Sequence, residues 1–226
     1  RTAASQAAYE GSIPFARSRI RDCCEAEGEK GFVLTGTTAS REARRPNFLQ
    51  IALGGALTGI LTPVLQPWID RMPGTPGMFR IALLAVPFAI LVLALLRYFA
   101  MSPWWAAFTA AIVTIVAFLC AVNVAIWVDG EMAGGDKMIR NVLDGLGGGF
   151  TGSAVMAAGI SLLPAGPRDA PAWLPMLVIG TLAGTLLALD SVLNLDLVSV
   201  LYPVWQAGVA VGLTMALQQA KPAWSR

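Results

Sequence analysis

The feature that most constrains this sequence is a series of long apolar windows that begins at residue 48. A helix needs about 20 mostly apolar residues to cross a bilayer. Six windows reach that length: 48–69, 78–101, 104–128, 140–163, 173–193 and 198–220. Turn-forming runs separate them, among them MPGTPG at 72–77 and PAGPRDAP at 164–171. The pattern predicts an all-α integral membrane protein whose six transmembrane helices form one bundle, 48–220.

The composition favours lipid over water as the solvent of this bundle. Of the 226 residues, 56% are hydrophobic and 13% are charged, whereas soluble domains carry roughly a quarter charged residues. The chain has no histidine, and its three cysteines show no metal-ligand spacing. We therefore expect the lipid bilayer as a partner, no cofactor and no metal. No basic patch lies within 48–220, so we expect no nucleic acid.

The six windows differ in quality. The first contains Pro63 and Pro67 together with several polar residues, so it is the weakest, and the second is the cleanest. Were the first a re-entrant or interfacial segment, five spans would remain and the termini would lie on opposite sides. Aromatic residues stand near most window ends, where amphipathic rings prefer the headgroup layer. These residues are Trp68, Trp104, Trp105, Trp127, Trp173 and Tyr202.

Basic residues in the loops predict the orientation of the bundle, because cytoplasmic loops carry the excess of lysine and arginine. With the N-terminus inside, the inner side holds Arg41, Arg44, Arg45, Arg97, Arg168, Lys221 and Arg226. The outer side then holds Arg71, Arg80, Lys137 and Arg140. This bias predicts a multi-pass protein of the bacterial inner membrane, with cytoplasmic tails at 33–47 and 221–226.

The segment 1–32 is expected to be no part of the fold. Residues 1–18 read RTAASQAAYEGSIPFARS, and they can be back-translated into a string that resembles the 3′ half of a bacterial glycine tRNA. That string holds an anticodon stem, a CCC anticodon and the GGTTCGATTCC of the TψC arm. We interpret 1–32 as a mis-translated tRNA gene and spacer, with the start of translation at Val33 or Leu34. The alternative is an ordinary disordered tail.

A short motif indicates an internal duplication. The pattern LGGxxTG occurs at 53–59 and again at 146–152. With the same displacement, the second window falls on the fifth and the third on the sixth. Two consecutive three-helix units must have opposite orientations, as in inverted-repeat transporters. The hypothesis is two inverted three-helix repeats, and chance similarity between glycine-rich helices is the alternative.

Small residues recur four positions apart in these windows, and residues at that spacing share a helix face. Glycine on such a face lets two helix backbones approach closely within a membrane. The face could be a gating interface, a cavity lining, static packing inside the bundle or the seam of a homo-oligomer. The predicted packing or cavity residues are Gly54, Gly55, Thr58, Gly59, Gly147, Gly148, Thr151, Gly152, Gly180, Gly184, Gly208 and Gly212.

Polar side chains at membrane depth are costly and are candidates for function. We single out Asp144, Asp190, Asn123 and Gln206. Asp144 can pair with Arg140 one helical turn earlier, which would be a purely structural role. In antiparallel fourth and fifth helices, Asp144 and Asp190 could instead face one another and share a proton. We expect Asn123 and Gln206 to bond to neighbouring helices.

No constellation of nucleophile and base is present, so the sequence predicts a non-enzymatic protein. Buried polar residues, glycine-lined helices and the repeat favour a permease-like transporter or a subunit of a transport system. The alternative is a structural or accessory protein that oligomerises or binds a membrane partner through its small-residue faces.

Overall fold

The computed structural model describes residues 47–164, 166–193 and 199–219. The chain divides into two units, 1–44 and 45–226, and all described residues belong to the second. The interpretations of 1–32, of the tail before residue 47 and of the tail 221–226 therefore lie outside the described residues. Every regular element in the described part is an α-helix. The helices are α1 (Phe48–Asp70), α2 (Gly77–Leu84), α3 (Val86–Phe99), α4 (Trp104–Glu131), α5 (Lys137–Ser161), α6 (Ala170–Gly184), α7 (Leu186–Leu193) and α8 (Leu201–Gln219).

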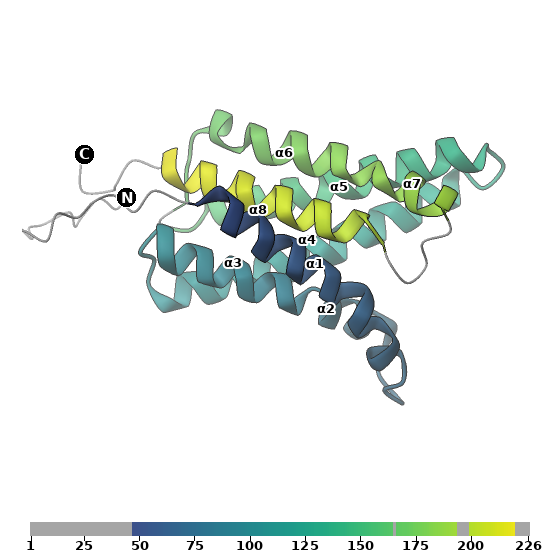
Figure 1. The fold of residues 1–226 in the computed structure, drawn as a ribbon, viewed down its shortest axis with the longest axis horizontal. Coiled ribbons are helices and arrows are strands. Elements are labelled where there is room, and N and C mark those ends of the chain that lie inside the picture. The colour runs from purple at the N-terminus through teal and green to yellow at the C-terminus, as the bar shows by residue number, and fades with distance from the viewer. Residues whose placement is uncertain (1–46, 165, 194–198, 220–226) are drawn as a thin grey trace, which may run out of the picture. The chain divides into compact units, whose positions relative to one another are not determined.

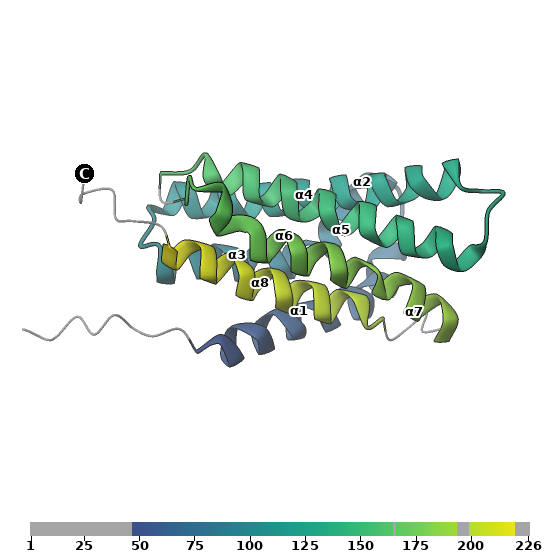
Figure 2. The same cartoon turned by 90° about the horizontal axis from the view of Figure 1, so that it is seen from above.

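Two pairs of these helices, α2 with α3 and α6 with α7, are each separated by a single residue and continue one another. With each pair taken as one rod, consecutive rods alternate in direction along the chain (Figure 1). Neighbours pack in a closed ring, in the order α1, α8, α6, α5, α4 and α3, with α3 again touching α1. Figure 2 shows α8 between α1 and α6. A continuous core of apolar side chains, including Val92, Met156, Met176 and Leu213, fills the ring.

The predicted windows coincide with these rods, but only part of the six-span prediction is established. Three rods in the described part are long and apolar enough to cross a membrane: α1, α4, and α6 joined to α7. A fourth, α2 with α3, qualifies if its two bent helices count as one span. Helix α5 contains Arg140 and Asp144, and α8 contains Gln206, which lowers their hydropathy. The count of six stays a prediction.

The geometry of the first two windows does not follow their hydropathy. The first is an unbroken helix in spite of Pro63 and Pro67, whereas the second bends by 45° between α2 and α3. Pro87 follows the break and occupies the first turn of α3. Proline has no N–H to donate and its ring collides with the preceding turn, which favours the break at Ala85. Hydropathy alone does not register this constraint.

The outer surface of the bundle is apolar over most of its length. Large apolar side chains are exposed on every long helix, for example Leu57 on α1, Ile112 on α4, Phe150 on α5 and Leu182 on α6. Such a continuous apolar exterior is unfavourable in water and is expected of helices in contact with lipid. These helices are therefore compatible with a membrane protein, as the composition predicts.

The aromatic residues at the window ends divide into two groups. Trp68, Trp104, Trp105 and Trp127 are exposed, which is compatible with a place in the headgroup layer. Trp173 is buried instead and donates its indole N–H to the carbonyl of Pro167 at 3.0 Å. It therefore anchors the loop before α6.

Candidate functional site

The first LGGxxTG segment packs directly onto the backbone of α8. A Cβ atom added at Gly55 would lie 2.6 Å from Cα of Ala207, and one at Gly59 would overlap the backbone of Pro203. Thr58 donates its hydroxyl to the carbonyl of Gly55 at 2.9 Å, which satisfies the hydroxyl within its own helix. Helices α1 and α8 therefore meet along a seam that admits no side chain at these two positions.

The second LGGxxTG segment lies on α5, which uses two glycine faces. Gly145 and Gly149 pack against Gly184 and Gly180 of α6. A Cβ added at Gly145 or Gly149 would overlap the carbonyl oxygen of its partner glycine. On the other face, Gly148 and Gly152 approach Ala121 of α4. The added Cβ atoms would lie 3.0 Å from the Ala121 carbonyl oxygen and 3.1 Å from its Cβ. The contact with α4 is thus looser than the contact with α6.

The remaining small residues complete the same pattern. Gly212 of α8 would place a Cβ 2.8 Å from Cα of Met176, and Gly208 would overlap the side chain of Ile179. Gly54 and Gly147 have room, since the nearest atoms belong to side chains 3.4 Å away. Most of the predicted small-residue faces therefore contact other helices of this chain.

A pocket of about 200 Å³ lies beside the second LGGxxTG segment. Helices α4, α5 and α8 and the α6–α7 junction form its walls. The lining residues are Phe118, Ala121, Val122, Ala125 and Ile126 of α4, Asp144, Gly145, Gly148 and Gly149 of α5, Gly184 and Leu187 at the junction, and Leu201, Tyr202 and Trp205 of α8. Nearly all of this lining is apolar. Glycines let the α5 and α6 backbones form part of the wall.

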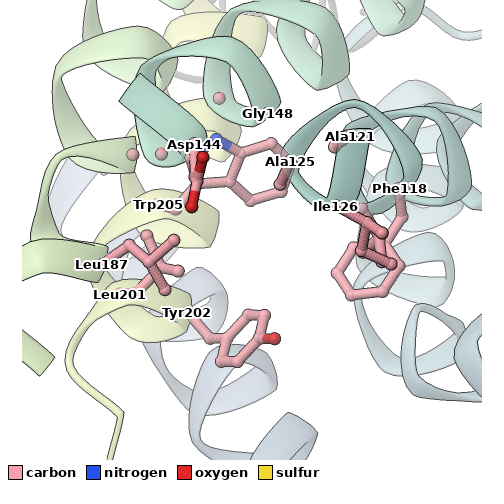
Figure 3. Close-up of a pocket in the computed structure, with 14 residues that line it drawn as sticks. Phe118, Ala121, Ala125, Ile126, Asp144, Gly148, Leu187, Leu201, Tyr202 and Trp205 are labelled. Atoms are coloured by element: carbon pink, nitrogen blue, oxygen red, sulfur yellow. The ribbon is translucent and has the colours of Figure 1, made fainter. Parts of the chain in front are cut away.

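Asp144 is the charged residue of this lining (Figure 3). Its carboxylate points into the space between Trp205, Leu187 and Tyr202. The residue is 4% exposed, and its Oδ1 has no hydrogen-bond partner among the described residues. Burial of a carboxylate without a partner is costly, so a positively charged or hydrogen-bonding group beside Asp144 would offset that cost.

The predicted pairing of Asp144 with Arg140 is wrong. Arg140 forms an ion pair with Asp129 of α4 instead, at 2.8 Å between Nε and Oδ1. The turn between α4 and α5 brings these two helix ends together, and Asp129 reaches the guanidinium from across the interface. Arg140 is still close enough to act on Asp144 electrostatically, but the described residues show no direct ion pair between the two.

Asp190 has a different environment. Its carboxylate accepts hydrogen bonds from the hydroxyl of Ser199 and from the backbone N–H groups of Val200 and Leu201, the latter two at 3.0 and 3.3 Å. These N–H groups stand at the start of α8, where backbone donors lack partners within the helix. Asp190 therefore holds the beginning of α8, and the expected proton sharing between two facing aspartates is not seen.

The other two candidates lie outside the pocket lining. Gln206 is fully buried and donates its Nε2 to the hydroxyl of Thr62 on α1 at 3.1 Å, so the expected bond to a neighbouring helix is present. Asn123 is exposed on α4 and donates to the carbonyl of Leu119 at 2.7 Å within its own helix. Its amide also lies 3.9 Å from Sδ of Met78 on α2. The four predicted polar candidates therefore do not form one site.

Sequence reasoning missed the aromatic side of the pocket. Phe118, Tyr202 and Trp205 line it, and the rings of Phe118 and Tyr202 lie 6.3 Å apart. The position of Tyr202 near a window end predicts a residue of the headgroup layer, not of a pocket. Nothing in the sequence around Trp205 distinguishes it from a residue that only packs against other helices. No family model matches this chain, and the comparisons with curated proteins and with solved structures found no match either.

Proposed function

We propose that the protein is a small multi-pass membrane permease, or the membrane subunit of a transport system, and that the pocket beside Asp144 receives the solute. The observation that carries the proposal is the buried carboxylate of Asp144, which points into the pocket (Figure 3) and has one oxygen without a hydrogen-bond partner among the described residues. Intramembrane ionisable groups commonly mark the path of a substrate or an ion.

A local irregularity in one helix supports this proposal. The pocket wall includes Gly184 and Leu187, which lie next to the junction of α6 and α7 at Thr185. In many transporters the substrate binds where a membrane helix is discontinuous, because irregular backbone is tolerated where it lines a cavity. Here α6 and α7 together form one span, so the junction is a mild irregularity of this kind and not a break in the helix.

The order of the helices does not favour an inverted repeat. An exchange of the two halves would replace α1 by α5, α2 and α3 by α6 and α7, and α4 by α8. The ring order of the helices is unchanged by this exchange, whereas a two-fold axis in the membrane plane, which relates inverted repeats, would reverse that order. Helices α1 and α5 run in opposite directions (Figure 1), so an axis along the membrane normal does not relate them either. The six-span bundle is part of the proposal, and the two inverted three-helix units rest on the LGGxxTG motif alone.

The alternative, a structural or accessory protein, needs free small-residue faces. Here the glycine faces of α1, α5, α6 and α8 are occupied by helices of the same chain. A partner would have to bind elsewhere, on the exposed apolar surface, and such a surface is equally expected of contact with lipid. The pocket therefore favours transport.

A transporter must open its solute pocket to each side of the membrane in turn, and thiol labelling tests this directly. In a chain with Cys23, Cys24 and Cys120 replaced by serine, Ala125→Cys places a thiol in the pocket wall. A membrane-impermeant maleimide is applied to right-side-out and to inside-out vesicles. We expect labelling from both sides.

Ala110→Cys is the matched control, because Ala110 lies on the same helix and is fully buried in the core. It should remain unlabelled in both kinds of vesicle. If the thiol at position 125 is labelled from one side only, or from neither, alternating access does not occur and the transport proposal fails.

A further inference from the structure

We infer that the pocket beside Asp144 binds a small monovalent organic cation, such as an ammonium group that carries apolar substituents. This inference rests on the proposed function, because it names the class of solute that the same pocket would accept. The charge, the wall chemistry and the size of the pocket each point to this class.

The charge of the pocket favours a cation. Asp144 lines it, whereas no lysine or arginine is among its lining residues in the described part of the chain. The nearest basic group along α5, Arg140, is already paired with Asp129. A cation in the pocket would offset the cost of burying the Asp144 carboxylate, whereas an anion would add repulsion to that cost.

The walls favour an organic cation over a metal ion. Phe118, Tyr202 and Trp205 present aromatic rings to the pocket, and ring faces attract ammonium groups, most strongly when these are desolvated. Hard metal ions require several oxygen ligands. The described residues contain no group of three or more His, Cys, Asp or Glu side chains that could hold a metal ion.

The size of the pocket limits the ligand. Its volume of about 200 Å³ is smaller than the roughly 300–1,000 Å³ of sites for drug-sized molecules. One charged nitrogen with a few methyl or ethyl groups is therefore the scale of ligand that fits. A single carboxylate also matches a single positive charge.

Three probes of similar shape and different charge test the inference on the purified full chain. They are choline, its neutral analogue with a quaternary carbon in place of the nitrogen, and the trimethylacetate anion. Binding is measured by isothermal titration calorimetry in lipid nanodiscs. We expect choline to bind at least about tenfold more tightly than the neutral analogue, and the anion not to bind.

The Asp144→Asn variant separates the charge from the fold. It should lose at least about tenfold in choline affinity while it keeps the affinity of the neutral analogue, which also shows that the pocket is intact. Glu131→Gln is the matched control, because it removes the same charge at an exposed position outside the pocket lining. It should leave choline binding unchanged.

The inference is overturned if choline does not bind, if the neutral analogue or the anion binds as tightly as choline, or if Asp144→Asn binds choline like the unmodified chain. The labelling experiment distinguishes this failure from failure of the transport proposal. Choline binding without two-sided labelling leaves the ligand class intact and removes transport. Two-sided labelling without a preference for the cation leaves transport intact and removes the ligand class.

Discussion

The two LGGxxTG segments have the same motif and different surroundings. In α1, Gly55 and Gly59 lie directly against the α8 backbone, and a buried hydrogen bond between Gln206 and Thr62 spans the same pair of helices. In α5, Gly148 and Gly152 lie less tightly against Ala121 of α4. Gly148 borders the pocket, whereas the first motif contributes nothing to its lining.

This difference shows how one motif can give either a closed seam or a cavity wall. A helix with a glycine face can approach its neighbour until the two backbones touch, which maximises dispersion contacts where lipid offers no hydrophobic drive. The α1–α8 pair reaches that limit. The α5 helix reaches it only on its α6 face, and space remains next to α4 where Asp144 and the aromatic residues of α8 meet.

The largest effect should come from closing the space at the tight seam. Gly55→Ala places a methyl group against backbone atoms of Ala207, and backbone cannot move aside as a side chain does. Overpacking of this kind costs about 1–3 kcal/mol and occasionally more. We expect a clear fall in the midpoint of thermal unfolding in detergent. Gly54→Ala, one residue earlier, is the matched control. Its methyl group would meet only the side chain of Leu91, at an ordinary contact distance, so it should not lower the midpoint.

A smaller effect should come from the polar bond across the same seam. Thr62→Val leaves the buried Nε2 of Gln206 without its acceptor, which should cost about 1 kcal/mol in the free energy of unfolding. Thr114→Val is the control, because Thr114 is equally buried and its hydroxyl bonds only to the carbonyl of Ala110 in its own helix. If both variants lose the same unfolding free energy, the Thr62 hydroxyl contributes only within its own helix. The hydrogen bond to Gln206 then does not stabilise the contact between α1 and α8.

The positions of the helices in this fold can be predicted from the sequence, because hydropathy and turn-forming residues are properties of short segments of the chain. The fifth window begins at residue 173 and the rod begins at Ala170, while the third window and α4 begin at the same residue, Trp104. The bend before Pro87 is the exception. A window average treats that proline as one more residue of intermediate hydropathy, whereas its effect is steric.

The site is less predictable because it depends on which helices become neighbours. The pocket joins parts of α4, α5, α8 and the α6–α7 junction, and no local pattern fixes that combination. The error over Arg140 has the same origin. A spacing of four residues makes Asp144 its expected partner, but Asp129 from the preceding helix reaches the guanidinium instead. The sequence identifies Asp144 as a candidate. That its carboxylate forms no ion pair with Arg140 follows only from the tertiary contact between Arg140 and Asp129.

The smallest effects should come from the second motif, and they test the comparison most sensitively. Gly147→Ala meets only side chains at ordinary contact distance, so it should gain up to about 0.5–1 kcal/mol from reduced backbone entropy in the unfolded chain. Gly148→Ala has the same entropic gain in stability. Part of that gain is lost because the new methyl group would lie 3.0 Å from the carbonyl oxygen of Ala121, which is a tight contact. Its net change in unfolding free energy should lie near zero, measured as for Gly55→Ala. A loss in Gly148→Ala as large as the loss in Gly55→Ala would mean that the two seams are equally tight, and the space beside Asp144 would then need another origin.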